Sequence, residues 1–218
     1  MSKRTLPAFP ASLQRIAAGA FAGVGEALTA AGTLDLSALD SIGAYAFTGS
    51  SLKKIILPAT MTELAPGVFA NCSELTSVDG AERLLAIGEK SFRNCGKLTS
   101  LDLTAALAVG DEAFYGAKLT DLTAPVLREV GTRAFCSVPL TALNLPALTT
   151  IGSYAFAQMS SLTTATLGPV TSMGSAVFNG SARLASVSFA DGTTLVGDFA
   201  FYSLSNLATV TLPDSVKV

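Results

Sequence analysis

The sequence predicts an α/β solenoid, in which a short unit is repeated and each copy stacks on the one before it. Half the residues are apolar, enough for a continuous core. A phenylalanine recurs at spacings of 21 to 26 residues, at positions 21, 47, 69, 92, 114, 135, 156, 178 and 201. An apolar residue lies five positions before each of them, and a glycine follows it in seven of the nine copies. A period in the twenties is typical of stacked repeats. We therefore expect about nine coils of 21–26 residues, with parallel strands and short helical turns, in one domain spanning residues 1–218.

The segment that follows each phenylalanine predicts a strand. It has the form Leu-x-x-Leu-x-Leu, as in Leu98 to Leu103 and Leu140 to Leu145. The last four residues alternate between apolar and polar, which is the period of a half-buried strand. Proline follows directly at Pro58, Pro146 and Pro213, and it ends the strand because it has no N–H to donate.

The apolar-glycine pair that precedes each phenylalanine predicts a tight turn or a close approach between backbones, as in Ile151-Gly152. The piece after it, residues 153–159, is too short for an independent helix. We expect it to form one or two helical turns once it is packed.

Two of the three cysteines occupy equivalent positions in the repeat. Cys72 and Cys95 each lie three residues after a repeat phenylalanine, in a slot that elsewhere holds Val138, Met159 or Leu204. Such a slot is interior, where cysteine behaves as a small hydrophobe, so we expect buried, reduced thiols. A disulfide between stacked coils is the alternative. Together with Cys136 they form neither a disulfide framework nor a zinc spacing.

Composition excludes several classes of function. The formal charge is −2 with no basic tail, which argues against binding of nucleic acid. The chain has no histidine, so it lacks the commonest general base and metal ligand. No uninterrupted apolar stretch predicts a membrane span, and no segment is a convincing signal peptide. We expect an intracellular protein without cofactor or metal, with the cell surface as the alternative location.

The assembled motif resembles the BspA-like, or Treponema pallidum-type, leucine-rich repeats. The motif reads Ile-Gly-x-x-Ala-Phe-x-x-Cys-x-x-Leu-Thr-x-Leu-x-Leu-Pro, as in residues 87–103 and 151–167. The resemblance covers nearly the whole chain and implies a leucine-rich repeat solenoid. It also implies either of two roles, since members of the family include surface proteins implicated in adhesion and intracellular proteins. The chain departs from the motif at residues 64–66, where proline precedes Gly67, and between Phe21 and Leu34.

One pair of carboxylates suggests an enzyme. The outward positions of the predicted strands form a stripe on which Asp79 and Asp102 are neighbours. Their separation would be about 5 Å, as in a retaining glycosidase. The simpler interpretation is two solvated aspartates that share a ladder. With no aromatic platform or cleft around them, we predict a protein that is not an enzyme.

The distribution of charge predicts a docking face. Residues 134–182 contain no Asp, Glu, Lys or Arg, whereas soluble surfaces normally carry interspersed charge and interface cores are depleted of it. Hydration by serine and threonine is the alternative. The predicted protein-binding residues in this block are Asn144, Tyr154, Gln158, Met159, Thr164 and Thr166. A mixed-charge patch of Arg83, Lys90, Arg93 and Lys97, flanked by Glu82 and Glu89, is either a solvated face or a site for an acidic partner.

We therefore predict a non-catalytic protein–protein interaction scaffold, a subunit or docking module of a larger assembly. The alternative is a surface adhesin that binds extracellular protein or glycan through its hydroxyl-rich stripe. Residues 212–218 read as the opening of a further repeat and no polar capping unit follows. An open solenoid end exposes core and strand edge, so we expect the C-terminal end to be covered by a partner or a second copy.

Overall fold

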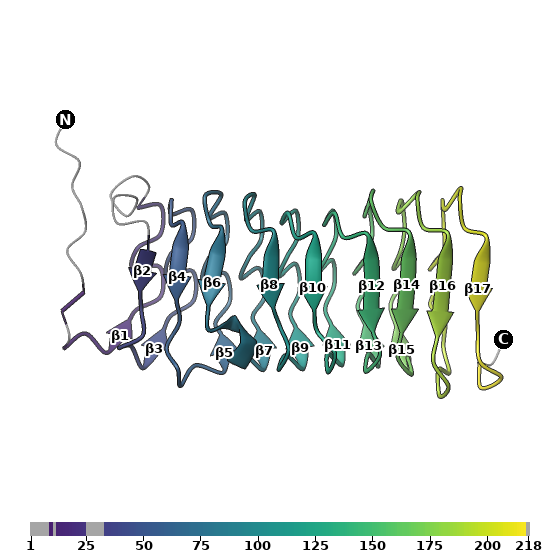
Figure 1. Ribbon diagram of the computed structural model, residues 1–218, viewed down its shortest axis with the longest axis horizontal. Coiled ribbons are helices and arrows are strands. Elements are labelled where there is room, and N and C mark those ends of the chain that lie inside the picture. The colour runs from purple at the N-terminus through teal and green to yellow at the C-terminus, as the bar shows by residue number, and fades with distance from the viewer. Residues whose placement is uncertain (1–8, 11, 25–32, 217–218) are drawn as a thin grey trace.

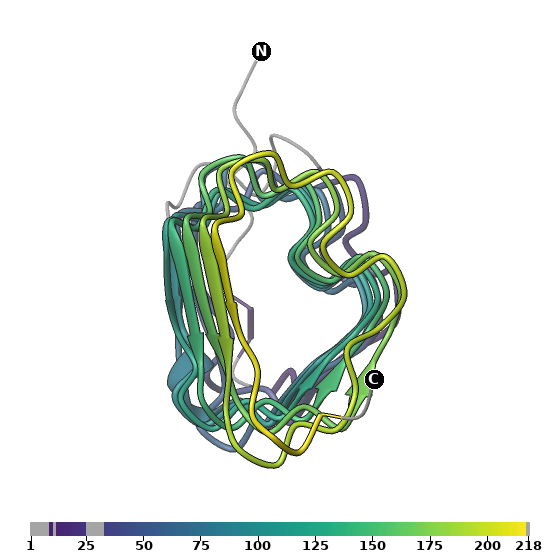
Figure 2. The ribbon, with the colours of Figure 1, turned by 90° about the vertical axis from the view of Figure 1, so that its right-hand side faces the viewer.

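The protein is a straight solenoid of stacked coils. The computed structural model describes residues 9–10, 12–24 and 33–216. The coils succeed one another along the longest axis (Figure 1), and seen end-on they superimpose on a common outline (Figure 2). The predicted solenoid is therefore confirmed.

One side of every coil is a parallel strand, and these strands together form what we call the strand wall. Their outward positions alternate with buried ones, as the Leu-x-x-Leu-x-Leu pattern predicts. They pair in three sheets, of order β2-β4-β6, β10-β8 and β12-β14-β16-β17. The strands are β2 (Thr33–Asp35), β4 (Lys54–Ile56), β6 (Ser77–Asp79), β8 (Ser100–Asp102), β10 (Asp121–Thr123), β12 (Ala142–Leu145), β14 (Thr164–Leu167), β16 (Ser186–Phe189) and β17 (Thr209–Thr211).

A second set of strands, each of two residues, contains the apolar residue five positions before each repeat phenylalanine. They pair in a two-stranded sheet, β1-β3, and a six-stranded sheet, β15-β13-β11-β9-β7-β5. The strands are β1 (Arg15–Ile16), β3 (Ser41–Ile42), β5 (Glu63–Leu64), β7 (Ala86–Ile87), β9 (Ala108–Val109), β11 (Glu129–Val130), β13 (Thr150–Ile151) and β15 (Ser172–Met173).

The segments around the repeat phenylalanines are turns, not the helical turns that we expected. In the described residues the only helical element is a short 3-10 helix, η2 (Ala81–Arg83). The reason is the backbone: the residues two before and two after each phenylalanine adopt left-handed φ, as at Tyr154 (58°) and Gln158 (55°) around Phe156. Left-handed residues interrupt a right-handed helix at once. We call these five-residue segments the turn wall; Figure 2 places them opposite the strand wall.

Backbone hydrogen bonds between coils in the turn wall all run in one direction. Phe114 donates its N–H to the carbonyl of Ala134 at 2.8 Å, and Phe135 donates to Ala155 at 2.9 Å. The left-handed residues do the same, since Glu112 donates to Thr132 at 2.8 Å. The alternating backbone thus turns three peptide groups per coil the same way, with N–H toward the C-terminal end and C=O toward the N-terminal end.

The core is a column of stacked phenylalanine rings. From Phe21 to Phe201 neighbouring rings are stacked at 5.1 to 6.1 Å between centroids. The seven from Phe47 to Phe178 have no exposed surface. Each coil buries its apolar face only against its neighbours, so stability is shared along the stack.

The sheet of two-residue strands is interrupted where the motif departs from the consensus. Strand β3 does not pair with β5, and in this coil Ala65 takes the place of the repeat glycine. Glycine is needed there because a Cβ at the equivalent Gly43 or Gly152 would lie 2.4 Å from a backbone nitrogen of the preceding coil. The connection before β5 is also one residue longer than the connection before β3. A shallow depression marks this junction, lined by residues 40–42 and 60–66.

Candidate protein-interaction surfaces

The strand wall contains three of the predicted binding residues, all exposed. Asn144 on β12 is opposite Thr166 on β14, and Thr164 is opposite Ala142. The same two outward columns continue through Ser186, Ser188, Thr209 and Thr211. The predicted outward stripe is therefore correct in register, and over β12, β14, β16 and β17 it carries no charge.

The turn wall contains two more of the predicted residues, on the other side of the molecule. Tyr154 and Gln158 are exposed at left-handed positions two residues before and two after Phe156. Because the strand wall and the turn wall are on opposite sides of the coil (Figure 2), the predicted set does not form one face. The charge-free block has two separate surfaces.

Met159 is a correction to the predicted set. Its side chain has no exposed surface, so it cannot contact a partner in this fold. Met159 occupies the interior slot three residues after the repeat phenylalanine, the slot also used by Cys72 and Cys95. The slot is internal because the chain turns back toward the strand wall just after the left-handed residue.

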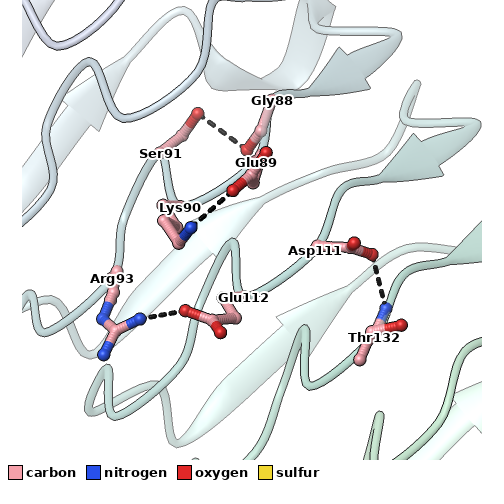
Figure 3. A network of polar contacts seen from close by, with 8 residues as sticks. All are labelled: Gly88, Glu89, Lys90, Ser91, Arg93, Asp111, Glu112 and Thr132. Carbon is pink, nitrogen blue, oxygen red and sulfur yellow. Dashed lines mark hydrogen bonds and ion pairs between the residues drawn. The ribbon is translucent and has the colours of Figure 1, made fainter.

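Polar contacts link three coils across the turn wall (Figure 3). Lys90 contacts Glu89 at 2.5 Å, and this hydrogen bond raises the pKa of the lysine. Arg93 pairs with Glu112 of the next coil. In the same region Asp111 accepts the N–H of Thr132 at 2.7 Å, which joins two coils through a side chain.

The predicted basic patch is consequently a set of paired charges. Arg83 contacts Glu82 at 2.5 Å and Lys97 contacts Glu74 at 2.7 Å, so all four of its cations have an acidic neighbour. Exposed ion pairs contribute little to stability, typically below about 1 kcal/mol. They leave little uncompensated positive charge for an acidic partner, which favours the solvated-face interpretation.

The tyrosines form a feature of which the sequence interpretation named only Tyr154. All four are in the turn wall, Tyr45 and Tyr154 two residues before a repeat phenylalanine, Tyr115 and Tyr202 one residue after it. Two of them carry an arginine over the ring: Arg93 over Tyr115 at 4.8 Å and Arg133 over Tyr154 at 5.4 Å. Tyrosine and arginine are the residues enriched at interface hot spots. Counting tyrosines relative to the phenylalanines would have found this surface.

The aspartate pair does not have the arrangement of an acid–base couple. Asp79 forms an ion pair with Lys54 at 2.8 Å. Asp102 instead accepts the N–H of Thr104, two residues further along the chain, at 2.9 Å. Both side chains are exposed. Each carboxylate has its own partner and no enclosing cleft, so nothing in this geometry prepares one to donate and the other to accept a proton.

The cysteines are buried, free thiols, as predicted for Cys72 and Cys95. Cys72 and Cys95 each donate a hydrogen bond to the carbonyl of the repeat phenylalanine in the preceding coil: Cys72 to Phe47 and Cys95 to Phe69, both at 3.2 Å. Burial raises the pKa of both thiols, well above the usual value for Cys95. They are packing residues that also donate a hydrogen bond to the preceding coil.

Two other kinds of site were searched in the described part of the chain. It contains no cluster of three or more Cys, Asp or Glu side chains able to hold a metal ion. Within the same residues, no helix has the length and apolar character needed to cross a membrane.

These observations define a class of protein: a leucine-rich repeat solenoid whose exposed features are the strand wall and the turn wall. The sequence matches a BspA type leucine-rich repeat region, described as six copies, over residues 4–109 and 107–218. The chain belongs to the BspA type leucine-rich repeat family.

Two solved bacterial structures are similar in fold to this chain. A leucine-rich repeat protein from Bacteroides ovatus is 26% identical, with a TM-score of 0.81 over 96% of this chain and 55% of its own. The chain thus spans about half the length of that protein. The T. pallidum leucine-rich repeat protein is 24% identical, with a TM-score of 0.53 over 74% of this chain and 70% of its own, a likeness of fold alone. No curated protein matches the chain.

Proposed function

We propose that the protein is a non-catalytic protein–protein interaction scaffold, a subunit or docking module of a larger assembly. Leucine-rich repeat proteins of this family typically serve as interaction modules. The observation that carries the proposal is the charge-free block of residues 134–182, which supplies exposed surface on both walls of consecutive coils. When a partner covers such a surface, no unpaired charge is buried, so the free-energy penalty of burying one is absent.

The two walls are separable candidates for the docking face. The strand-wall candidate contains Asn144, Thr164 and Thr166, a flat surface of short uncharged side chains. The turn-wall candidate contains Tyr154 and Gln158, with Arg133 stacked over the tyrosine ring. A rigid aromatic side chain with an arginine beside it binds with little loss of side-chain entropy, which favours the turn wall.

One pair of substitutions tests the proposal and chooses the wall. Thr166→Lys and Gln158→Lys each place a charge on one wall of the block and leave the core untouched. The variant on the docking wall should lose co-purification of the native partner, because a buried unpaired charge is costly. Thr123→Lys and Asn94→Lys are matched controls at equivalent positions outside the block. If both test variants retain their partners, the docking face lies outside this block.

An adhesin is the second candidate, favoured by the uncharged hydroxyl columns of the strand wall. Hydroxyl side chains are in register on three successive strands: Thr164 and Thr166 on β14, Ser186 and Ser188 on β16, and Thr209 and Thr211 on β17. An adhesin should be accessible on intact cells and should lose binding to extracellular protein or glycan when Thr166 becomes lysine. Labelling of intact cells with an antibody to the protein separates this role from an intracellular one.

We also propose that a protein surface covers the last coil of the 218-residue chain. Its apolar side chains Phe199 and Tyr202 are 71% and 61% exposed. Patches of this kind normally mark interaction sites.

A further inference from the structure

The junction between β3 and β5 leaves backbone N–H groups of β5 and its flanks without partners. Inside the six-stranded sheet the equivalent groups donate to the preceding coil, as Gly131 donates to the carbonyl of Val109 at 2.8 Å. At the junction these groups are the N–H of Thr62 and the N–H of Ala65, and no described residue accepts either of them. This side of the junction is therefore an open strand edge that offers donors.

The facing edge, on β3, has the complementary character. The carbonyls of Asp40 and Ile42 are equivalent to the acceptors in the paired coils, and no described residue donates to them. Both edges border the depression lined by residues 40–42 and 60–66, which has a volume of about 440 Å³. That volume is within the range of ligand-binding pockets. One side of the depression thus offers acceptors and the other side offers donors.

The opening is confined to one corner of these two coils. In the strand wall β4 pairs with β6 across the same two coils. In the core the rings of Phe47 and Phe69 are stacked at 5.9 Å between centroids. In the turn wall Tyr45 donates its N–H to the carbonyl of Pro66 at 2.8 Å. The junction is therefore a local gap in one sheet, held in place by regular stacking on the other sides of the coil.

The depression at the junction is acidic. Asp40 and Glu63 line it with exposed side chains, and neither forms an ion pair with a described residue. None of the residues that line the depression is basic. The mixed-charge patch differs in this respect, because each of its cations has an acidic neighbour. The charge of the depression is thus complementary to a positively charged partner.

We propose that the junction between β3 and β5 binds an extended segment of a partner protein that carries basic side chains. A segment that lies parallel to both strands donates its N–H groups to the β3 edge and accepts hydrogen bonds from the β5 edge. Main-chain hydrogen bonds of this kind supply affinity, and the side chains of alternate residues supply specificity. A lysine or arginine of the segment pairs with Asp40 or Glu63. The inference deepens the proposed role as an interaction scaffold, at a surface separate from the charge-free block.

The first test measures binding of a defined peptide to the 218-residue chain. The probe is a fluorescein-labelled peptide of alternating lysine and valine, and fluorescence anisotropy should show binding that salt weakens. Asp40→Asn with Glu63→Gln should weaken binding about two- to fivefold for each charge removed. Asp121→Asn with Glu129→Gln is the matched control and should leave binding unchanged. It removes the same charge, and Glu129 has the position of Glu63 on a strand that is paired on both sides.

A second test examines the main-chain hydrogen bonds. The same peptide with every backbone nitrogen methylated keeps its charges but loses its donors, so it should bind about fivefold more weakly for each hydrogen bond lost. Hydrogen exchange followed by NMR gives an independent measurement. The amides of Thr62 and Ala65 should exchange rapidly in the free chain and slowly with the unmethylated peptide bound. The amides of Arg128 and Gly131 donate to the preceding coil and should be protected in both states.

Several outcomes would overturn the proposal. They are absence of binding, equal affinities of the two double variants, and amides of Thr62 and Ala65 that the peptide leaves unprotected. Equal affinity of the methylated peptide would show that the depression attracts positive charge alone. Circular dichroism checks that the variants fold, and Glu63→Gln compared with Glu129→Gln replaces the double variants if they do not. Thr166→Lys and Gln158→Lys should leave peptide binding unchanged, so failure of this inference and failure of the proposed docking walls are seen separately.

Discussion

The left-handed residues that flank each phenylalanine determine what the turn wall presents to solvent. Glycine and asparagine, which tolerate this conformation, occupy several of these positions, including Gly49, Gly67, Asn71 and Asn94. Elsewhere the position holds a larger residue such as Arg133 or Tyr154. Such a residue costs about 1 kcal/mol or more in backbone strain. The strained sites include those that carry the aromatic and charged surface, so strain coincides with the candidate interface.

Ala176 offers a clean measurement of that strain. It has φ of 56° and is buried with only a methyl group to lose, so Ala176→Gly should stabilise the fold by up to about 1 kcal/mol. The gain is the relieved strain minus the added entropy of the unfolded chain. Ala157→Gly is the matched control, because Ala157 is also buried but does not have a positive φ. This variant should be less stable than the native chain. Urea denaturation gives both values, and a loss of stability in Ala176→Gly would show that strain is negligible.

The buried thiols make the stability of the fold decrease as the pH rises in the alkaline range. Burial raises the pKa of the Cys95 thiol in the folded state, so only the unfolded chain ionises near its ordinary value of about 8.5. The contribution of the Cys95 thiol to the free energy of unfolding is therefore fully present below about pH 8.5. It is lost as the pH rises toward the pKa of the folded state. Denaturant unfolding between pH 7 and 10 should show a flatter decline in Cys95→Ala than in the native chain. Identical slopes would mean that the thiol ionises equally in both states.

At the scale of the element, close approach between coils depends on the repeat glycine. A Cβ at Gly152 would lie 2.4 Å from the backbone nitrogen of Thr132, too close for any residue but glycine. The junction between β3 and β5, where Ala65 replaces that glycine, is where the short-strand sheet is interrupted. The longer connection before β5 contributes to the same interruption.

Gly152→Ala should therefore disturb the pairing of β11 with β13. We expect a loss of about 1–3 kcal/mol, the usual range for overpacking of a tight core. Gly96→Ala is the control, because the nearest atom to its added Cβ is 3.8 Å away. Thermal unfolding should separate the two variants clearly. Equal stability would mean that the coils can move apart at no cost.

At the scale of the whole molecule, stability should be lowest at the ends. Interior coils have two neighbours, while the coils of Phe21 and Phe201 have one each among the described residues, and both rings are only partly buried. In a linear stack the end units open first. Native-state hydrogen exchange should show slowest exchange at Phe92, Phe114 and Phe135, and fastest at the two ends. Uniform protection from end to end would indicate that the solenoid opens as one unit.

The sequence alone determined the solenoid, its coil count, the strand register and the buried slot of Cys72 and Cys95. These follow from periodicity, because an apolar residue that recurs once per coil can be buried only by stacking on its equivalents. Tertiary structure alone decided three matters: the left-handed turns in place of helical ones, the burial of Met159, and the separation of Asn144 and Thr166 from Tyr154 and Gln158. The physical reason is that a repeat specifies which residues are equivalent between coils, whereas the path of the backbone within one coil decides which side each residue faces.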